Sequence, residues 1–122
     1  MVLVFAIDMR SRWRGVGTLF DHAVIVHLSL GDGGFGAEDV RDAVRLLERD
    51  IEAALDGGDA GELDGDEFGG GEAILYLYGV DADDLFAAIE PLLRGSSLHP
   101  VRAVLRYGDA SDPAAHERRI EL

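Results

Sequence analysis

The sequence predicts an α+β fold in which a layer of two helices packs on one β-sheet, a two-layer sandwich. Three observations predict it: two strand-like runs that are almost continuously apolar, two helical stripes with apolar residues at steps of three and four, and a glycine triplet that joins two strands as a hairpin. The chain of 122 residues is long enough to bury one hydrophobic core, so we expect a single domain.

The first predicted elements are strands. Val2–Asp8 has the pattern of a strand, and Ser11–Gly17 follows as a loop that holds two arginines and the only tryptophan. Phe20–Leu30 is rich in β-branched residues and nearly continuous in apolar character, which is typical of a strand buried on both faces. Because the valines at alternate positions of this strand supply the core, His27 should face away from the helices.

Ala37–Leu55 is the clearest helix. Its apolar residues recur at steps of four, three, four and four, and acids occupy its first turn, where the helix dipole favours negative charge. A second helix is predicted from an N-cap at Asp81 to about Arg94. Pro91 lies inside that pattern and is expected to kink or shorten the helix.

The segment between the two helices predicts a hairpin. Gly69–Gly71 separates the polar run Glu62–Phe68 from the apolar run Glu72–Tyr78, so we expect an exposed edge strand followed by a buried strand. Val101–Tyr107 alternates between apolar and polar residues and predicts a further strand. Glu117–Leu122 is expected to return as a last edge strand.

This order is β-α-β-β-α-β with extra strands at the N- and C-terminal ends, and its core is the split βαβ, or ferredoxin-like, arrangement. That arrangement places its first and third strands in the middle of the sheet, and here these are the two most apolar runs of the chain. Within one domain over residues 1–122, we predict an N-terminal extension strand and loop over 1–18, a ferredoxin-like core over 20–108, and a C-terminal loop and edge strand over 109–122.

The negative charge is concentrated in one third of the chain. The whole sequence carries 24 acidic and 11 basic side chains, a net charge of −13, and residues 32–72 alone hold 14 acids against three arginines. An acidic chain is not expected to bind nucleic acid, which selects a basic face. The acids on and before the predicted edge strand form what we call the acidic edge: Asp59, Glu62, Asp64, Asp66 and Glu67.

The sequence disfavours several chemistries. It has no cysteine, which excludes disulfides, thiolate metal sites and Fe–S clusters. Its acids do not follow the spacing of a calcium-binding loop, and its four histidines form no metal-binding pair such as HxxxH. No serine lies in a nucleophile motif. We predict no metal, no cofactor and no catalytic residue, and no run is long enough to span a membrane. Whether the chain is an enzyme stays open.

The sheet face that points away from the helices is a second candidate site, which we call the open face. Five residues that combine charge, aromatic rings and an imidazole are expected on it: His27, Tyr76, Tyr78, Arg102 and Arg106. Such a mixture could bind an anionic small molecule or the carboxylates of a partner, and it could also pack against a second copy of the chain.

Three motifs resemble a group of small bacterial proteins of unassigned function. They are Gly61–Gly71 (GELDGDEFGGG), Ala73–Phe86 (AILYLYGVDADDLF) and Arg106–Gly108 (RYG). That group carries an FDGxEFGxG hairpin, an LYxYGxDAD helix start and a closing RYG strand, and the similarity covers about residues 22–122. This chain departs from the pattern at Leu63, where an aromatic residue is expected, and at Val80, where proline is expected. The resemblance implies a ferredoxin-like fold and no particular activity.

These observations together predict a cytoplasmic, non-catalytic binding or regulatory protein. It would engage a protein partner through the acidic edge or the open face, as an immunity protein does when it blocks a basic toxin, and it could also form a homodimer. The alternative is a small-ligand-binding domain or a small enzyme that uses the open face.

Overall fold

The computed structural model describes residues 22–34, 36–108 and 112–122. These residues form an α+β fold with the elements β1 (His22–Ser29), α2 (Glu38–Leu55), β2 (Glu62–Gly69), β3 (Glu72–Gly79), α3 (Ala82–Arg94), β4 (His99–Tyr107) and β5 (His116–Glu121). The strand predicted at Val2–Asp8 and the loop predicted at Ser11–Gly17 lie outside the described residues.

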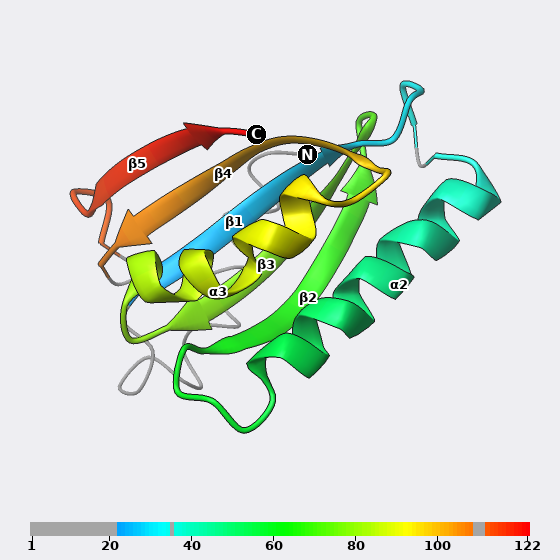
Figure 1. Cartoon of the computed structure of the whole chain (residues 1–122). Coiled ribbons are helices and arrows are strands. Elements are labelled where there is room, and N and C mark those ends of the chain that lie inside the picture. Colours follow the sequence, from blue (N-terminus) through cyan, green and yellow to red (C-terminus); the bar gives the residue numbers. More distant parts are fainter. Residues whose placement is uncertain (1–21, 35, 109–111) are drawn as a thin grey trace.

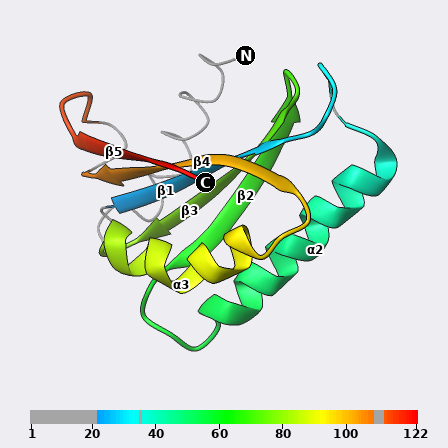
Figure 2. The same cartoon turned by 45° about the horizontal axis from the view of Figure 1, so that its top comes forward.

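The strands form one five-stranded sheet in the order β2-β3-β1-β4-β5, and every neighbouring pair is antiparallel. The two most apolar strands, β1 and β3, are neighbours inside the sheet, as predicted, whereas β2 and β5 form its two edges. Both helices lie on the same face of the sheet (Figures 1 and 2), so the described residues form two layers.

The hydrophobic core lies between the sheet and the helices. Alternate residues of the inner strands point into it, as strand geometry requires, and the apolar stripe of each helix closes it from the other side. Its fully buried members include Val24, Val26, Leu28, Leu75, Leu77 and Leu105 from the sheet, Val44 and Ile51 from α2, and Leu85, Ile89 and Leu93 from α3.

The predicted hairpin joins β2 to β3 through a two-residue turn. Gly69 pairs with Glu72, and the turn residues Gly70 and Gly71 have φ values of +62° and +83°, a conformation that strongly favours glycine. The N–H of Gly71 donates to the carbonyl oxygen of Gly34 at 2.9 Å, which fastens the turn to the loop after β1.

Helix α3 begins and ends where the sequence predicted. The side chain of Asp81 accepts hydrogen bonds from the backbone N–H groups of Asp83 and Asp84, which confirms it as the N-cap. The helix ends at Arg94, so Pro91, which was expected to kink or shorten it, does not shorten it. Pro91 lies close to the C-terminal end, where its carbonyl oxygen still accepts the N–H of Gly95 at 3.0 Å.

Candidate functional site

The register of the sheet places all five predicted open-face residues opposite the helices. Tyr78 and Arg106 are both paired with Ala23, Tyr76 is paired with Ile25, and Arg102 is paired with His27. Their neighbours along each strand point into the core instead. The predicted grouping of these side chains on one face therefore agrees with the structure.

His27 belongs to a three-residue cluster with Glu72 and Arg102. Its Nδ1 lies 3.0 Å from Oε1 of Glu72 and 3.2 Å from Nη2 of Arg102, and Nη1 of Arg102 lies 3.5 Å from Oε2 of Glu72. One nitrogen cannot donate to a carboxylate and accept from a guanidinium at the same time. We assign Nδ1–H as the donor to Glu72, because this is the shorter contact and the N–H groups of both His27 and Arg102 then face the carboxylate.

Burial lowers the pKa of His27 below its ordinary value, because desolvation disfavours the charged imidazolium. The hydrogen bond with Glu72 offsets part of this effect, and the nearby charge of Arg102 lowers the pKa further. A neutral imidazole held through Nδ1 by a carboxylate keeps Nε2 as a basic nitrogen, which is how a general base is oriented. Among the described residues, no serine or threonine hydroxyl is hydrogen-bonded to His27, so these residues supply no activated nucleophile to it.

Arg106 has a structural role in the sheet. Its Nη1 donates to Oε2 of Glu117 at 2.6 Å, and its Nη2 donates to the carbonyl oxygen of Asp112. Only 10% of the Arg106 side chain is exposed. These bonds tie β4 to β5 and to the residues that precede it, so little of the guanidinium is available for a ligand.

The two tyrosines of the open face are buried. Tyr76 is 3% exposed and Tyr78 is 1% exposed, although both helices lie on the other side of the sheet. The sequence indicated an accessible face on which both rings could contact a ligand or a partner. In the structure, His27, Arg102 and Glu72 are partly exposed on this face.

The acidic edge is divided between the two faces of the sheet. Asp66 is paired with the core residue Leu75 and therefore faces α2, whereas Glu67 is paired with Ile74 and faces the other way. The register shifts beside Asp64, which makes it a bulge residue in the edge strand. The remaining members of the acidic edge, Asp59 and Glu62, are exposed.

Asp66 forms a carboxyl pair with Glu48 of α2. Burial, the hydrogen bond with Asp66 and the negative charge of Asp66 together raise the pKa of Glu48 from 4.5 to about 8, and burial contributes most. Arg45 opposes this effect only weakly, because its Nη1 lies 3.9 Å from Oδ2 of Asp66 and its side chain is 60% exposed. At neutral pH the pair therefore retains a proton.

The C-terminal end of α2 adds further negative charge beside this pair. The last turn of the helix has no basic residue, and the C-cap residue is Asp56. The helix dipole makes carboxylates unfavourable at this end. We use the name acidic surface for the acidic edge together with the neighbouring helix acids Glu48, Glu52 and Asp56.

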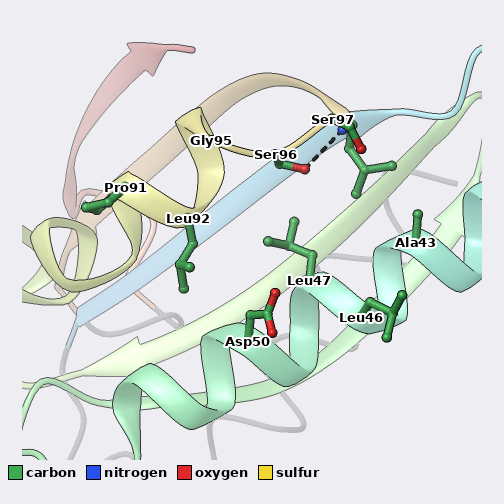
Figure 3. Close-up of a pocket in the computed structure, with 10 residues that line it drawn as sticks. Ala43, Leu46, Leu47, Asp50, Pro91, Leu92, Gly95, Ser96 and Ser97 are labelled. Carbon is green, nitrogen blue, oxygen red and sulfur yellow. Dashed lines mark hydrogen bonds between the residues drawn. The ribbon is translucent and has the colours of Figure 1, made fainter.

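A groove lies on the other flank of α2, between this helix and the end of α3 (Figure 3). It has a volume of about 330 Å³, and Ala43, Leu47 and Leu92 contribute apolar walls. Leu46 borders it and is 57% exposed, which is unusual for a leucine in this chain. The groove could accept one apolar side chain of a partner.

Other features of the described residues do not form ligand sites. The carboxylate of Asp32 accepts hydrogen bonds from the N–H groups of Gly34 and Gly36 in the glycine-rich loop. These N–H groups already bind an anionic side chain of the chain itself. In the ranges that the structure describes, no group of three or more histidine or acidic side chains is placed to hold a metal ion. Neither α2 nor α3 combines the length and apolar character that a membrane-crossing helix needs.

No protein-family model matches the sequence, and no curated protein or solved structure matches it. The resemblance to small bacterial ferredoxin-like proteins therefore stays a prediction.

Sequence reasoning missed two residues of these sites, Glu72 and Glu48. Glu72 follows the glycine turn directly, and its register opposite Ser29 puts it within reach of His27 on the next strand. The predicted hairpin sets only the register of β3 against β2, so the contact of Glu72 with β1 could not be derived from it. Glu48 could not be assigned either, because the helical pattern does not show which flank of α2 faces β2.

Proposed function

We propose that this chain is a cytoplasmic, ferredoxin-like binding protein whose acidic surface engages the basic surface of a protein partner. The order β2-β3-β1-β4, with antiparallel pairing throughout, supports the ferredoxin-like part of this proposal. The binding function is supported mainly by the carboxyl pair of Glu48 and Asp66, which is crowded enough to keep a proton near neutral pH.

The carboxyl pair supports a binding function because the pair does not stabilise the fold. Two adjacent carboxyl groups on a helix and an edge strand repel each other once both ionise. Asp56 and Glu52 add charge where the helix dipole disfavours it. Charged groups whose repulsion destabilises the fold are typical of functional surfaces, where a ligand supplies the opposite charge.

The groove between α2 and α3 gives this surface an apolar anchor point. Protein interfaces combine a buried apolar centre with a polar rim, and complementary charge mainly accelerates association and excludes wrong partners. Helix α2 contributes to both the apolar groove and the acidic surface. Leu46 borders the groove, and Glu48 belongs to the acidic surface on the opposite flank of the helix. A partner with an exposed apolar side chain among arginines or lysines fits this pattern.

The test uses three forms of the full chain as bait: the unchanged chain, a surface variant and a matched control. The surface variant is Glu52→Gln, Asp56→Asn and Asp59→Asn, and the control is Asp84→Asn, Asp112→Asn and Glu121→Gln. Both triple variants remove three negative charges from exposed positions, so they change the net charge of the chain equally. Each captured protein is purified and its dissociation constant is measured with all three forms.

The proposal predicts a captured protein whose affinity falls by about tenfold or more with the surface variant, equivalent to ~1.4 kcal/mol, and changes little with the control. Added salt should weaken the binding, because exposed charges are screened. Equal affinities for the two variants would contradict the proposal, since net charge alone would then explain the binding.

A further inference from the structure

The groove between α2 and α3 combines apolar walls with a carboxylate. Leu46, Leu47 and Leu92 supply apolar surface, and Asp50 is the only charged side chain among the described residues that line it. Figure 3 shows the carboxylate of Asp50 turned from α2 toward α3, beside Leu47. A ligand that fits this groove therefore needs an apolar part and a group that can pair with a carboxylate.

The carboxylate of Asp50 is available to a ligand. Within the described ranges, no side chain forms a hydrogen bond or an ion pair with it. Arg94, the basic residue in the last turn of α3, donates from Nε to Oε2 of Glu90 at 2.9 Å instead. An apolar side chain placed over Asp50 would remove water from the carboxylate without replacing its hydrogen bonds, which costs free energy. A cation would pair with it.

The C-terminal end of α3, which forms the other wall, also favours a cation. The N–H groups of Gly95 and Ser96 donate to carbonyl oxygens of α3 at 3.0 and 3.3 Å. The N–H of Leu98 donates to Oγ of Ser96 at 3.0 Å. These three donors are used within the chain, and the carbonyl end of a helix carries a partial negative charge. This wall therefore favours a ligand that donates hydrogen bonds over one that accepts them.

We propose that this groove binds one arginine or lysine side chain of the partner, with the hydrocarbon stem against the leucines and the cationic head at Asp50. The inference rests on the proposed binding function and names the side chain that enters the groove. Arginine and lysine bury their stems along apolar surfaces while their charged heads stay at polar groups. The groove volume of about 330 Å³ lies near the lower end of the range for ligand pockets, ~300 Å³, which suits a single side chain.

The charge of the chain favours a basic partner over a second copy as the occupant. Asp50 gives the groove flank of α2 the same sign of charge that Glu48 and Glu52 give the opposite flank. Two copies that each have a net charge of −13 repel each other. A partner with several basic side chains can contact both flanks of the helix.

The test is an NMR titration of the full chain with n-butylguanidinium, which reproduces the stem and the head of an arginine side chain. Two reference compounds separate the two parts: 1-butanol has the stem without the charge, and guanidinium has the charge without the stem. We expect n-butylguanidinium to shift the methyl signals of Leu46, Leu47 and Leu92 saturably. It should bind severalfold more tightly than either reference compound.

Two variants of the chain locate the cation. Asp50→Asn should weaken the binding of n-butylguanidinium by about threefold, as expected for a partly exposed ion pair, and should leave the binding of 1-butanol unchanged. The control, Asp84→Asn, removes the same charge from an exposed position at the opposite end of α3 and should change neither. Both positions are exposed, so both variants are expected to fold as the unchanged chain does.

Four results would overturn the inference: no saturable shift at the groove, 1-butanol that binds as tightly as n-butylguanidinium, equal binding to the unchanged chain and to Asp50→Asn, or groove signals that move when the free chain is diluted. The second result would indicate an apolar side chain as the occupant, and the last would indicate a second copy. The titration contains no partner, so its failure is distinct from that of the capture experiment, which tests the acidic surface.

Discussion

Replacing Leu75 with alanine is expected to lower the free energy of unfolding by about 2–5 kcal/mol, because it removes a fully buried side chain and leaves a cavity. Leu75 is 0% exposed and lies on β3 between its partners Val26 of β1 and Asp66 of β2. The loss is measured by urea unfolding of the full chain, followed by circular dichroism.

The matched control is Leu46→Ala, which makes the same chemical change at a position that is 57% exposed. Surface substitutions usually change stability by about 0.5 kcal/mol or less, so this variant should unfold close to the unchanged chain. Similar losses for the two variants would show that the core is not where the structure places it.

Gly61→Ala is expected to destabilise the chain by about 2–4 kcal/mol, because a β-carbon at this position collides with the backbone of the next strand. The added atom would lie 2.2 Å from the carbonyl oxygen of Tyr78, and the φ of Gly61 is +150°. Gly79 has the reciprocal constraint, since its β-carbon would lie 2.2 Å from the carbonyl oxygen of Ala60. This close approach fixes where β2 begins and thus where the acidic edge lies.

Gly33→Ala serves as the control for this backbone effect, because its β-carbon meets no atom within 4 Å and its φ lies outside the positive range. Thermal unfolding of both variants gives the comparison. If Gly61→Ala unfolds at the same temperature as Gly33→Ala, the backbones of β2 and β3 do not approach each other as described.

The sequence was sufficient for the order of the elements because each element carries a local signal. The apolar stripe of α2, the N-cap Asp81 and the glycine turn before Glu72 are each visible within a few residues, and each is confirmed. The alternation in β4 also predicted correctly that Arg102 and Arg106 share a face. The end of α3 near Arg94 was also predicted, although Pro91 lies inside the helix.

The sequence alone could not show which carboxylates of the acidic surface lie close together. Asp66 and Glu67 are adjacent in sequence and face opposite sides of the sheet, so the acidic edge is not one continuous patch. The partner of Asp66 is Glu48, which is 18 positions away and belongs to another element. Such a pair follows from the packing of α2 on β2, which local patterns do not determine.

The burial of Tyr76 and Tyr78 could not be predicted from the sequence for a different reason. Their strand was correctly predicted to have two apolar faces, but composition does not show what covers the second one.

The most direct test of the binding proposal is the pH dependence of the affinity for the captured partner. Glu48 has a raised pKa of about 8, so it is mostly protonated at pH 7 and gains its charge as the pH rises through 8. A cation of the partner favours the ionised form, so binding should release a proton below this pH. We therefore compare the unchanged chain with Glu48→Gln, which resembles the protonated side chain and cannot ionise.

We predict that the affinity of the unchanged chain, measured relative to Glu48→Gln, rises by about three- to tenfold as the pH increases through 8 and then levels off, since the pair is partly exposed and screened. Titrating groups of the partner affect both forms equally and cancel in the comparison. An affinity ratio that does not change with pH would contradict the proposal that this carboxyl pair lies in the interface.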